Sequence, residues 1–149
     1  MKILFVCLGN ICRSPLAEAI FNEKIKSKGL QNEFRSDSCG TANYEIGNWP
    51  DPRTIRSANK NNVPINHIAR QLTRADLQKF DLILAMDKNN LKGVLNLASD
   101  EEQSKIKLMR SYDPQGEGDV PDPYYGNEKD FDEVFAILNR SIEKLIDEL

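Results

Sequence analysis

Short apolar runs alternate with amphipathic stretches along this chain. The apolar runs predict buried strands over residues 2–6, 33–41, 80–87 and 105–110. Helical spacing of apolar residues predicts helices over 14–29, 54–61, 88–97 and 130–149. Because strands and helices alternate, we expect an α/β fold in which a parallel sheet carries helices on both faces. Ligands of such sheets bind beyond the carboxyl ends of the strands.

The first strand and the first helix are joined by a tight loop. Ser14 is a suitable N-cap, Pro15 a suitable first helical residue, and Gly29 a suitable stop. The opening therefore predicts a strand, a tight loop and a helix. With 149 residues in all, we expect the chain to form one domain, 1–149, with a sizeable core.

Charge and composition narrow the classes of function. The net charge of -3 offers no general attraction for nucleic acid or anionic membranes. No apolar run approaches the roughly 20 residues of a membrane span, and polar residues follow "MKILFV" too early for a secretory signal. Three cysteines, all at or before Cys39, with a single histidine, His67, resemble neither a disulfide framework nor a zinc site. We expect a cytoplasmic protein whose mechanism uses no metal and no cofactor.

The loop "CLGNICRS" has the features of an anion site. Backbone N–H groups between strand end and helix start can turn inward around a tetrahedral oxyanion, and the helix N-terminus adds positive charge. Arg13 offers two parallel donors to that anion, and the same environment favours a thiolate at Cys7, to which Ser14 can donate a hydrogen bond. The expected phosphate-binding residues are Leu8, Gly9, Asn10, Ile11, Cys12, Arg13 and Ser14.

Other interpretations of this loop remain open. Cys7 can be a small buried residue that ends a strand, with Arg13 paired to a surface carboxylate. A nucleotide-binding P-loop is disfavoured because "GNICRS" lacks the G-K-[ST] that contacts phosphates and magnesium.

A thiolate that attacks a phosphate ester needs an acid to protonate the leaving oxygen. The best candidate is Asp122 in "DVPDPYYG", within the breaker-rich segment 112–128. Pro121 and Pro123 restrict its loop, and Tyr124 and Tyr125 form an aromatic wall beside it. After the first step Asp122 can activate the water that attacks the phosphocysteine. The alternative is a solvated proline turn with Asp122 as turn former.

Taken together, "VCLGNICRSPLAEAIF", "DSCGT", "FDLILAMD" and "DVPDPYYGN" resemble the low-molecular-weight protein tyrosine phosphatase family, in order and over nearly the whole chain. The resemblance implies a three-layer, Rossmann-like or flavodoxin-like domain with a four-stranded parallel sheet. It implies that Cys7 is the nucleophile, Arg13 the phosphate clamp and Asp122 the general acid and base. The implied supporting network consists of Asn10, Ser14, Ser38 and His67.

The family resemblance also implies a substrate wall. Tyr44 and Tyr124 would flank the aromatic ring at the mouth, with Leu8 and Ile11 along the wall and Tyr125 beside them. The alternative for Tyr44 is an aromatic residue packed on the surface of its loop. A deep aromatic slot suits phosphotyrosine, whose phenol leaving group, with a pKa of about 10, is easier to expel than an alkoxide.

Two cysteines in one anion loop suggest redox protection. A thiolate at Cys7 with Cys12 near it can pass through a sulfenic acid to a reversible disulfide. The alternative is that Cys12 packs as a small apolar residue, as we expect for Cys39.

The expected activity is hydrolysis of protein phosphotyrosine and small aryl phosphates by a monomer or weak homodimer, with inorganic phosphate as product. Three rivals remain. Arsenate reductases of this fold use two further cysteines, but no cysteine follows Cys39. Phosphoarginine phosphatases typically carry threonine where this chain has Ile11. A non-catalytic phosphotyrosine-binding module would lack Cys7 or Asp122, and both are present.

Overall fold

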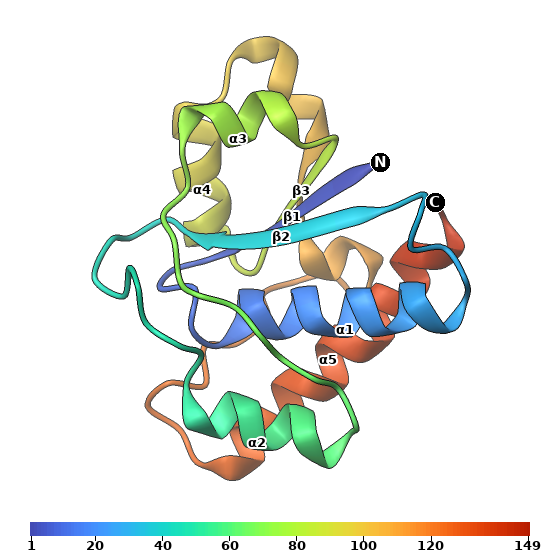
Figure 1. Ribbon diagram of the computed structural model, residues 1–149. Helices are drawn as coiled ribbons and strands as arrows, with labels where there is room; N and C mark the ends of the chain where they lie inside the picture. Colours follow the sequence, from blue (N-terminus) through green and yellow to red (C-terminus); the bar gives the residue numbers. More distant parts are fainter.

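The computed structural model describes residues 1–149 and has three layers (Figure 1). The middle layer is a sheet of four parallel strands in the order β2-β1-β3-β4. The strands are β1 (Lys2–Cys7), β2 (Arg35–Gly40), β3 (Leu82–Ala85) and β4 (Ile106–Leu108). Helices pack on both faces of the sheet, so the predicted fold class is confirmed.

The helices agree with the sequence prediction except for short elements that it missed. They are α1 (Arg13–Ser27), α2 (Pro52–Lys60), α3 (Arg74–Lys79), α4 (Lys88–Leu97) and α5 (Glu128–Asp147), with two 3₁₀ turns, η1 (Asp100–Lys105) and η2 (Met109–Tyr112). The sequence did not predict α3, which is too short to show a helical period. The capping box that Thr73 and Asp76 form is the local sequence feature that could have indicated this helix. None of the helices is both long and apolar enough to cross a membrane.

Side chains of β1 alternate between two cores. Ile3, Phe5 and Cys7 face the core that α1 and α5 cover, whereas Leu4 and Val6 face the smaller core under α3 and α4. This period of two is that of a strand buried on both faces. It points the Cys7 side chain toward α1, at the carboxyl end of the central strand.

The loop after β1 is held against the end of β2. Thr41 N donates to Cys7 O at 2.9 Å, and Ala42 N donates to Leu8 O at 3.0 Å. A Cβ atom at Gly40 would lie 2.6 Å from Leu8 O, closer than any side chain tolerates. Glycine at position 40 therefore allows the backbone at the end of β2 to contact the β1–α1 loop. This contact fixes the position of the loop relative to the sheet.

The start of α1 corrects the expected capping. The helix begins at Arg13, two residues before Pro15, the expected first helical residue, and no side chain caps it, so Ser14 is not the N-cap. Its hydroxyl instead lies 3.0 Å from Cys7 Sγ and accepts from Asn10 Nδ2 at 2.7 Å. The prediction was wrong because partners across the loop compete for the Ser14 oxygen. The first N–H groups of α1 are consequently left without a side-chain acceptor.

The carboxyl group of Glu18, on α1, is largely covered where the helix meets β2. Glu18 Oε1 accepts from Ser38 Oγ at 2.7 Å and lies 3.2 Å from His67 Nδ1. Burial raises the pKa of Glu18 to about 7 and lowers that of His67. Both shifts favour a neutral pair in which Glu18 keeps its proton.

This proton predicts how stability changes with pH. Between the ordinary pKa of 4.5 and about 7, the folded protein binds a proton at Glu18 that the unfolded chain has released. The contribution of Glu18 to the free energy of unfolding therefore falls as pH rises through this window, by up to about 1.4 kcal/mol per unit, and levels off above it. Glu18→Gln, which mimics the protonated acid, is expected to remove this loss.

Urea unfolding of both proteins from about pH 5 to pH 8 measures the difference, which should grow by roughly 2 kcal/mol in favour of the variant. Glu33→Gln, at an exposed position, is the matched control. Parallel stability curves for wild type and Glu18→Gln would contradict the assignment.

Candidate active site

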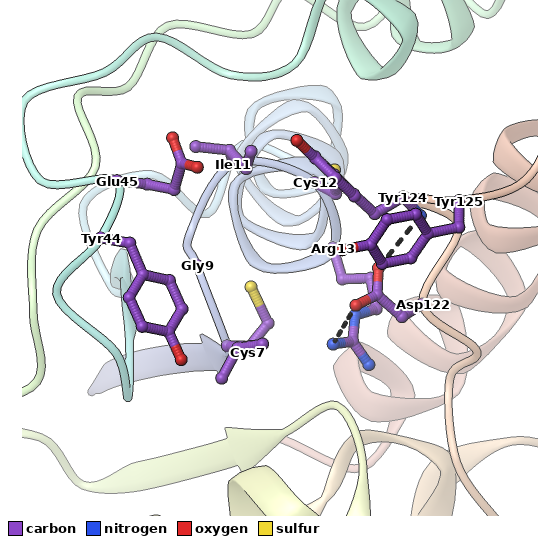
Figure 2. Close-up of a pocket in the computed structure, with 11 residues that line it drawn as sticks. Cys7, Gly9, Ile11, Cys12, Arg13, Tyr44, Glu45, Asp122, Tyr124 and Tyr125 are labelled. Atoms are coloured by element: carbon purple, nitrogen blue, oxygen red, sulfur yellow. Dashed lines mark hydrogen bonds and ion pairs between the residues drawn. The ribbon is translucent and has the colours of Figure 1, made fainter.

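A pocket opens at the carboxyl end of β1, over the β1–α1 loop (Figure 2). Its volume is about 210 Å³. The lining residues are Cys7, Leu8, Gly9, Ile11, Cys12, Arg13, Tyr44, Glu45, Asp122, Tyr124 and Tyr125. The pocket thus joins segments that are more than a hundred residues apart in the chain.

Hydrogen-bonding groups surround the sulfur of Cys7. Ser14 Oγ lies 3.0 Å from Sγ, and Asn10 N donates to Sγ at 3.3 Å. The side chain is almost fully buried by the protein, yet it borders the pocket. The sulfur therefore lies at the floor of the pocket, next to these two hydrogen-bonding groups and the N-terminus of α1.

Asn10 holds the loop in shape. Its φ of 59° is in the left-handed region, which asparagine tolerates better than most residues. Its amide nitrogen donates to Ser14 Oγ at 2.7 Å and to Ser38 Oγ at 3.0 Å. Its amide oxygen accepts from Arg70 N at 3.0 Å and lies 2.7 Å from His67 Nε2. The structure thus brings together all four residues of the expected network.

The contacts of Asn10 also determine the His67 tautomer. Since the Asn10 amide oxygen is an acceptor, His67 Nε2 must carry a proton and donate it. The other ring nitrogen, Nδ1, is then the acceptor in the neutral ring and lies 3.2 Å from Glu18 Oε1. Hydrogen bonds therefore run from Glu18 through Ser38 to Asn10, and His67 joins the same group through the Asn10 amide oxygen, next to the loop around Cys7.

Arg13 is buried and held by two partners. Nη1 donates to Asp87 Oδ2 at 2.7 Å and to Val120 O at 2.9 Å. Nη2 lies 3.6 Å from Asp122 Oδ2. Burial alone would lower the pKa of Arg13, but Cys7, Asp87 and Asp122 outweigh it and raise the pKa. The guanidinium is therefore permanently charged and fixed beside the sulfur.

Asp87 is a site residue that the sequence analysis missed. It follows β3, caps α4 by accepting from Asn90 N at 2.8 Å, and holds Arg13 with its other oxygen. A carboxylate at the end of a central parallel strand was an available signal. Glu45, which also lines the pocket, was missed as well, and no motif marks it.

Asp122 lies at the mouth of the pocket, with its side chain 45% exposed. Tyr124 N donates to its Oδ1 at 3.1 Å, which turns the carboxylate toward Arg13. The expected acid thus shares the pocket with Cys7, more than a hundred residues away in sequence.

The loop that carries Asp122 is anchored upstream. Asp113 accepts from Arg110 Nε and Arg140 Nε, each at 2.8 Å, and Arg110 Nη1 donates to Asp119 O at 3.0 Å. Burial alone would raise the pKa of Asp113, but hydrogen bonds, chiefly from Arg140, lower it to about 2. Val120 N donates to Met86 O at 2.8 Å. These contacts connect the loop that carries Asp122 to the residue after β3 and to α5.

Aromatic residues stand at the mouth. In Figure 2, Tyr44 lies on one side of Cys7, while Tyr124 and Tyr125 lie on the other. The two adjacent tyrosines pack edge to face with ring centroids 5.0 Å apart, and Tyr125 is 97% exposed. Leu8 and Ile11 line the pocket, as expected, so a planar apolar group fits between these side chains.

The remaining thiols differ from Cys7 in their surroundings. Burial and, next, the Asp51 carboxylate raise the pKa of Cys12 to about 12, so Cys12 is a neutral thiol at physiological pH. Cys12 nevertheless lines the same pocket as Cys7, and both are free. Cys39 packs in the smaller core with Leu4 and Val6.

One group of side chains has the composition of a metal site. Ligating atoms of Glu18, Asp37 and His67 lie within 4.8 Å of one another, outside the pocket. Their oxygens already accept hydrogen bonds from Ser38 and Arg70, and His67 supports Asn10. Within the pocket, Cys7 lies at the floor beside the fixed charge of Arg13, an arrangement that can receive a tetrahedral oxyanion over a sulfur nucleophile.

Comparisons with known proteins agree with this geometry. The family model of the low molecular weight phosphotyrosine protein phosphatases matches residues 2–149. A phosphatase of that name from Gallus gallus is 48% identical over 136 residues, 90% of this chain and 86% of the relative. A crystal structure of a protein tyrosine phosphatase from Entamoeba histolytica, with Hepes in its active site, has a TM-score of 0.97 and 38% identity, and covers 99% of this chain and 96% of that chain.

An arginine phosphatase from drosophila is also similar, with a TM-score of 0.92 and 31% identity over 99% of this chain and 97% of that chain. The fold is therefore shared by phosphatases of different substrates. The match of the family model across nearly every residue, together with the identity to the curated relatives, settles the assignment: this chain is a member of the low molecular weight phosphotyrosine protein phosphatase family.

Proposed function

We propose that this protein hydrolyses protein phosphotyrosine and small aryl phosphates through a phosphocysteine intermediate. The observation that carries the proposal is the position of Cys7 Sγ at the floor of a pocket that also holds Arg13 and Asp122. The nucleophile, a fixed cation and a carboxyl group thus share one small cavity.

In the first step, the phosphate binds to those N–H groups of the loop 8–14 that do not bond the sulfur, and to Arg13, whose fork geometry matches two phosphoryl oxygens. The Cys7 thiolate attacks phosphorus, and hydrogen bonds from Ser14 and Asn10 N orient the sulfur. Asp87 and Val120 O hold Arg13 in place, so its charge is already positioned when negative charge develops.

Asp122 performs the proton transfers. As a carboxylic acid it donates a proton to the phenolic oxygen that leaves, and as a carboxylate it then takes a proton from the water that attacks the phosphocysteine. Its partly exposed position at the mouth lies where the leaving group must exit and where water enters. The product is inorganic phosphate, and none of these steps calls for a cofactor.

The pocket walls support an aryl substrate. Tyr44, Tyr124 and Tyr125 line the pocket together with Leu8 and Ile11, and an aromatic ring can insert between such surfaces. Ile11 is apolar and offers no side-chain donor or acceptor to the guanidino group of phosphoarginine. These features favour phosphotyrosine over the substrate of the similar arginine phosphatase.

Phosphotyrosine-containing proteins or peptides are the partners that this pocket fits. We infer that the chain acts as a monomer or weak homodimer in the cytoplasm, where a reducing environment would keep its three cysteines free.

Replacing the nucleophile tests the mechanism directly. Cys7→Ser should lower kcat by at least about 1,000-fold, because a hydroxyl is not ionised at this site, while affinity for inorganic phosphate persists. Steady-state hydrolysis of p-nitrophenyl phosphate and calorimetric titration with phosphate measure the two effects. Wild type should cleave phosphotyrosyl peptides in preference to phosphoseryl and phosphoarginyl peptides, and should not reduce arsenate. Sustained turnover by Cys7→Ser would refute the covalent mechanism.

Replacing the acid should have an effect that depends on the leaving group. Asp122→Ala is expected to slow phenyl phosphate cleavage by about 10²–10⁴-fold and p-nitrophenyl phosphate cleavage less, because nitrophenolate leaves without protonation. Asp119→Ala is the matched control, since Asp119 lies in the same loop but outside the pocket and accepts from Lys88 N. An equal loss for both esters would remove Asp122 from the role of acid.

We also propose that Cys12 protects Cys7 from overoxidation. Peroxide converts the Cys7 thiolate to a sulfenic acid, and the Cys12 thiol then attacks that sulfur with release of water. Mild peroxide treatment followed by mass spectrometry should show a Cys7–Cys12 disulfide and recovery of activity with a thiol reductant. In Cys12→Ser, the same treatment should inactivate irreversibly. Equal recovery of both proteins would exclude this protection.

A further inference from the structure

Three large apolar side chains are exposed on segments that adjoin the pocket lining. Trp49 is 64% exposed, Ile46 55% and Ile68 45%. They lie on two segments that are bonded to each other, since Gly47 N donates to Ala69 O and Ala69 N donates to Asn48 O, each at 2.9 Å. We call these three side chains the rim patch. Single exposed apolar residues are common on proteins, whereas several on adjoining segments mark an interaction surface.

The rim patch is continuous with the pocket wall. Tyr44 and Glu45, at the start of the same segment, line the pocket, and Asn48 Nδ2 donates to Glu45 Oε2 at 2.6 Å. Beyond Trp49, Asp51 N donates to Ile11 O at 2.8 Å, and Ile11 also lines the pocket. Trp49 lies two residues from that anchor, at most about 7 Å along the chain. The indole is thus attached to the rim between two fixed contacts.

The opposite side of the rim is joined to this segment. The Arg53 guanidinium carbon lies 5.5 Å from the centroid of the Tyr124 ring, and Arg53 Nη2 donates to Asp51 Oδ2 at 2.8 Å. The segment from Tyr44 to Arg53 therefore follows the mouth from one aromatic wall to the other. Because these hydrogen bonds already hold the backbone of the segment, binding of a ligand would not require the loss of conformational entropy that ordering a loop costs.

We propose that the rim patch binds a large apolar side chain that flanks the phosphotyrosine of a substrate protein. This inference rests on the proposed function. The pocket, of about 210 Å³, has room for the phosphorylated side chain, so the substrate's neighbouring residues must cross the rim. Tryptophan is a frequent interface anchor because it buries much apolar area with few rotatable bonds.

The charges at the rim favour the same occupant. The Glu45 carboxylate stands between the pocket and the rim patch and would repel acidic residues beside the phosphotyrosine. The nearby Asp51 and Arg53 neutralise each other. An apolar flanking residue can therefore contact Trp49 without electrostatic repulsion from Glu45.

Kinetics of matched peptides test this proposal. One phosphotyrosyl peptide carries phenylalanine at the flanking positions and the other carries alanine there. Trp49→Ala should raise KM for the phenylalanine peptide by roughly tenfold, the loss typical of an interface anchor, with kcat changed less than about twofold. KM for the alanine peptide and for p-nitrophenyl phosphate should stay unchanged. Trp49→Phe should retain most of the preference.

Leu97→Ala is the matched control. Leu97 is also exposed, but it ends α4, about 15 Å along the helix from Asp87. We expect no change with either peptide. The inference is overturned if Trp49→Ala raises KM equally for both peptides, or if Leu97→Ala reproduces its effect.

Fluorescence gives a readout that does not need turnover. Trp49 is the single tryptophan of the chain, so its emission reports on the rim patch alone. When the phenylalanine peptide is titrated into Cys7→Ser, the emission should shift to shorter wavelength as the indole leaves water. The alanine peptide should bind more weakly and leave the emission near that of the free protein. Identical emission changes with both peptides would overturn the inference.

Two further outcomes are decisive. If wild type self-associates and Trp49→Ala is monomeric while peptide kinetics are unchanged, the rim patch is a contact between copies and the inference is wrong. If the protein hydrolyses no phosphate ester, the proposed function fails. The fluorescence titration still decides whether the rim patch binds the flanking residue.

Discussion

The active-site loop depends on one residue with an unusual backbone conformation. Asn10 has a φ of 59°, and its side chain bonds Ser14, Ser38, His67 and the backbone of Arg70. These partners come from α1, β2 and the segment before α3. A single side-chain amide thus holds the loop in its curve around the Cys7 sulfur. It also connects the loop to α1, to β2 and to the segment before α3. Only a side chain with both a donor and an acceptor can satisfy this arrangement.

The electrostatics of the site follow from that geometry. Arg13 would be costly to bury alone, but the neighbouring Cys7, Asp87 and Asp122 raise its pKa and keep it charged. Asp122 reaches the same cavity, and Asp113 anchors the loop that carries it to Arg110 and Arg140. Behind the loop, burial raises the pKa of Glu18 to about 7 and lowers that of His67, so both shifts favour the uncharged forms of the side chains next to Asn10.

Local patterns predicted much of this arrangement. The alternation of short apolar runs with helical periods indicated every strand of the sheet, and the cysteine, arginine and helix start near residue 13 indicated an anion site. Asp87 was missed because its contact with Arg13 joins residues 74 positions apart. The prediction that Ser14 caps α1 was wrong because it considered only the nearby helix N–H groups as partners of the hydroxyl. In the structure the hydroxyl instead contacts Asn10 and Cys7.

The sequence by itself determined the fold class, the family, the candidate nucleophile with its arginine, and the candidate acid, because these follow from periodicity and from motifs of contiguous residues. The tertiary structure alone decided which carboxylate holds Arg13, which residues support Asn10, why Gly40 admits no side chain, and where the apolar side chains around Trp49 lie. Each of these depends on distances between segments that are remote in the chain. Such distances are set by how the helices and loops pack on the sheet, and no local pattern encodes them.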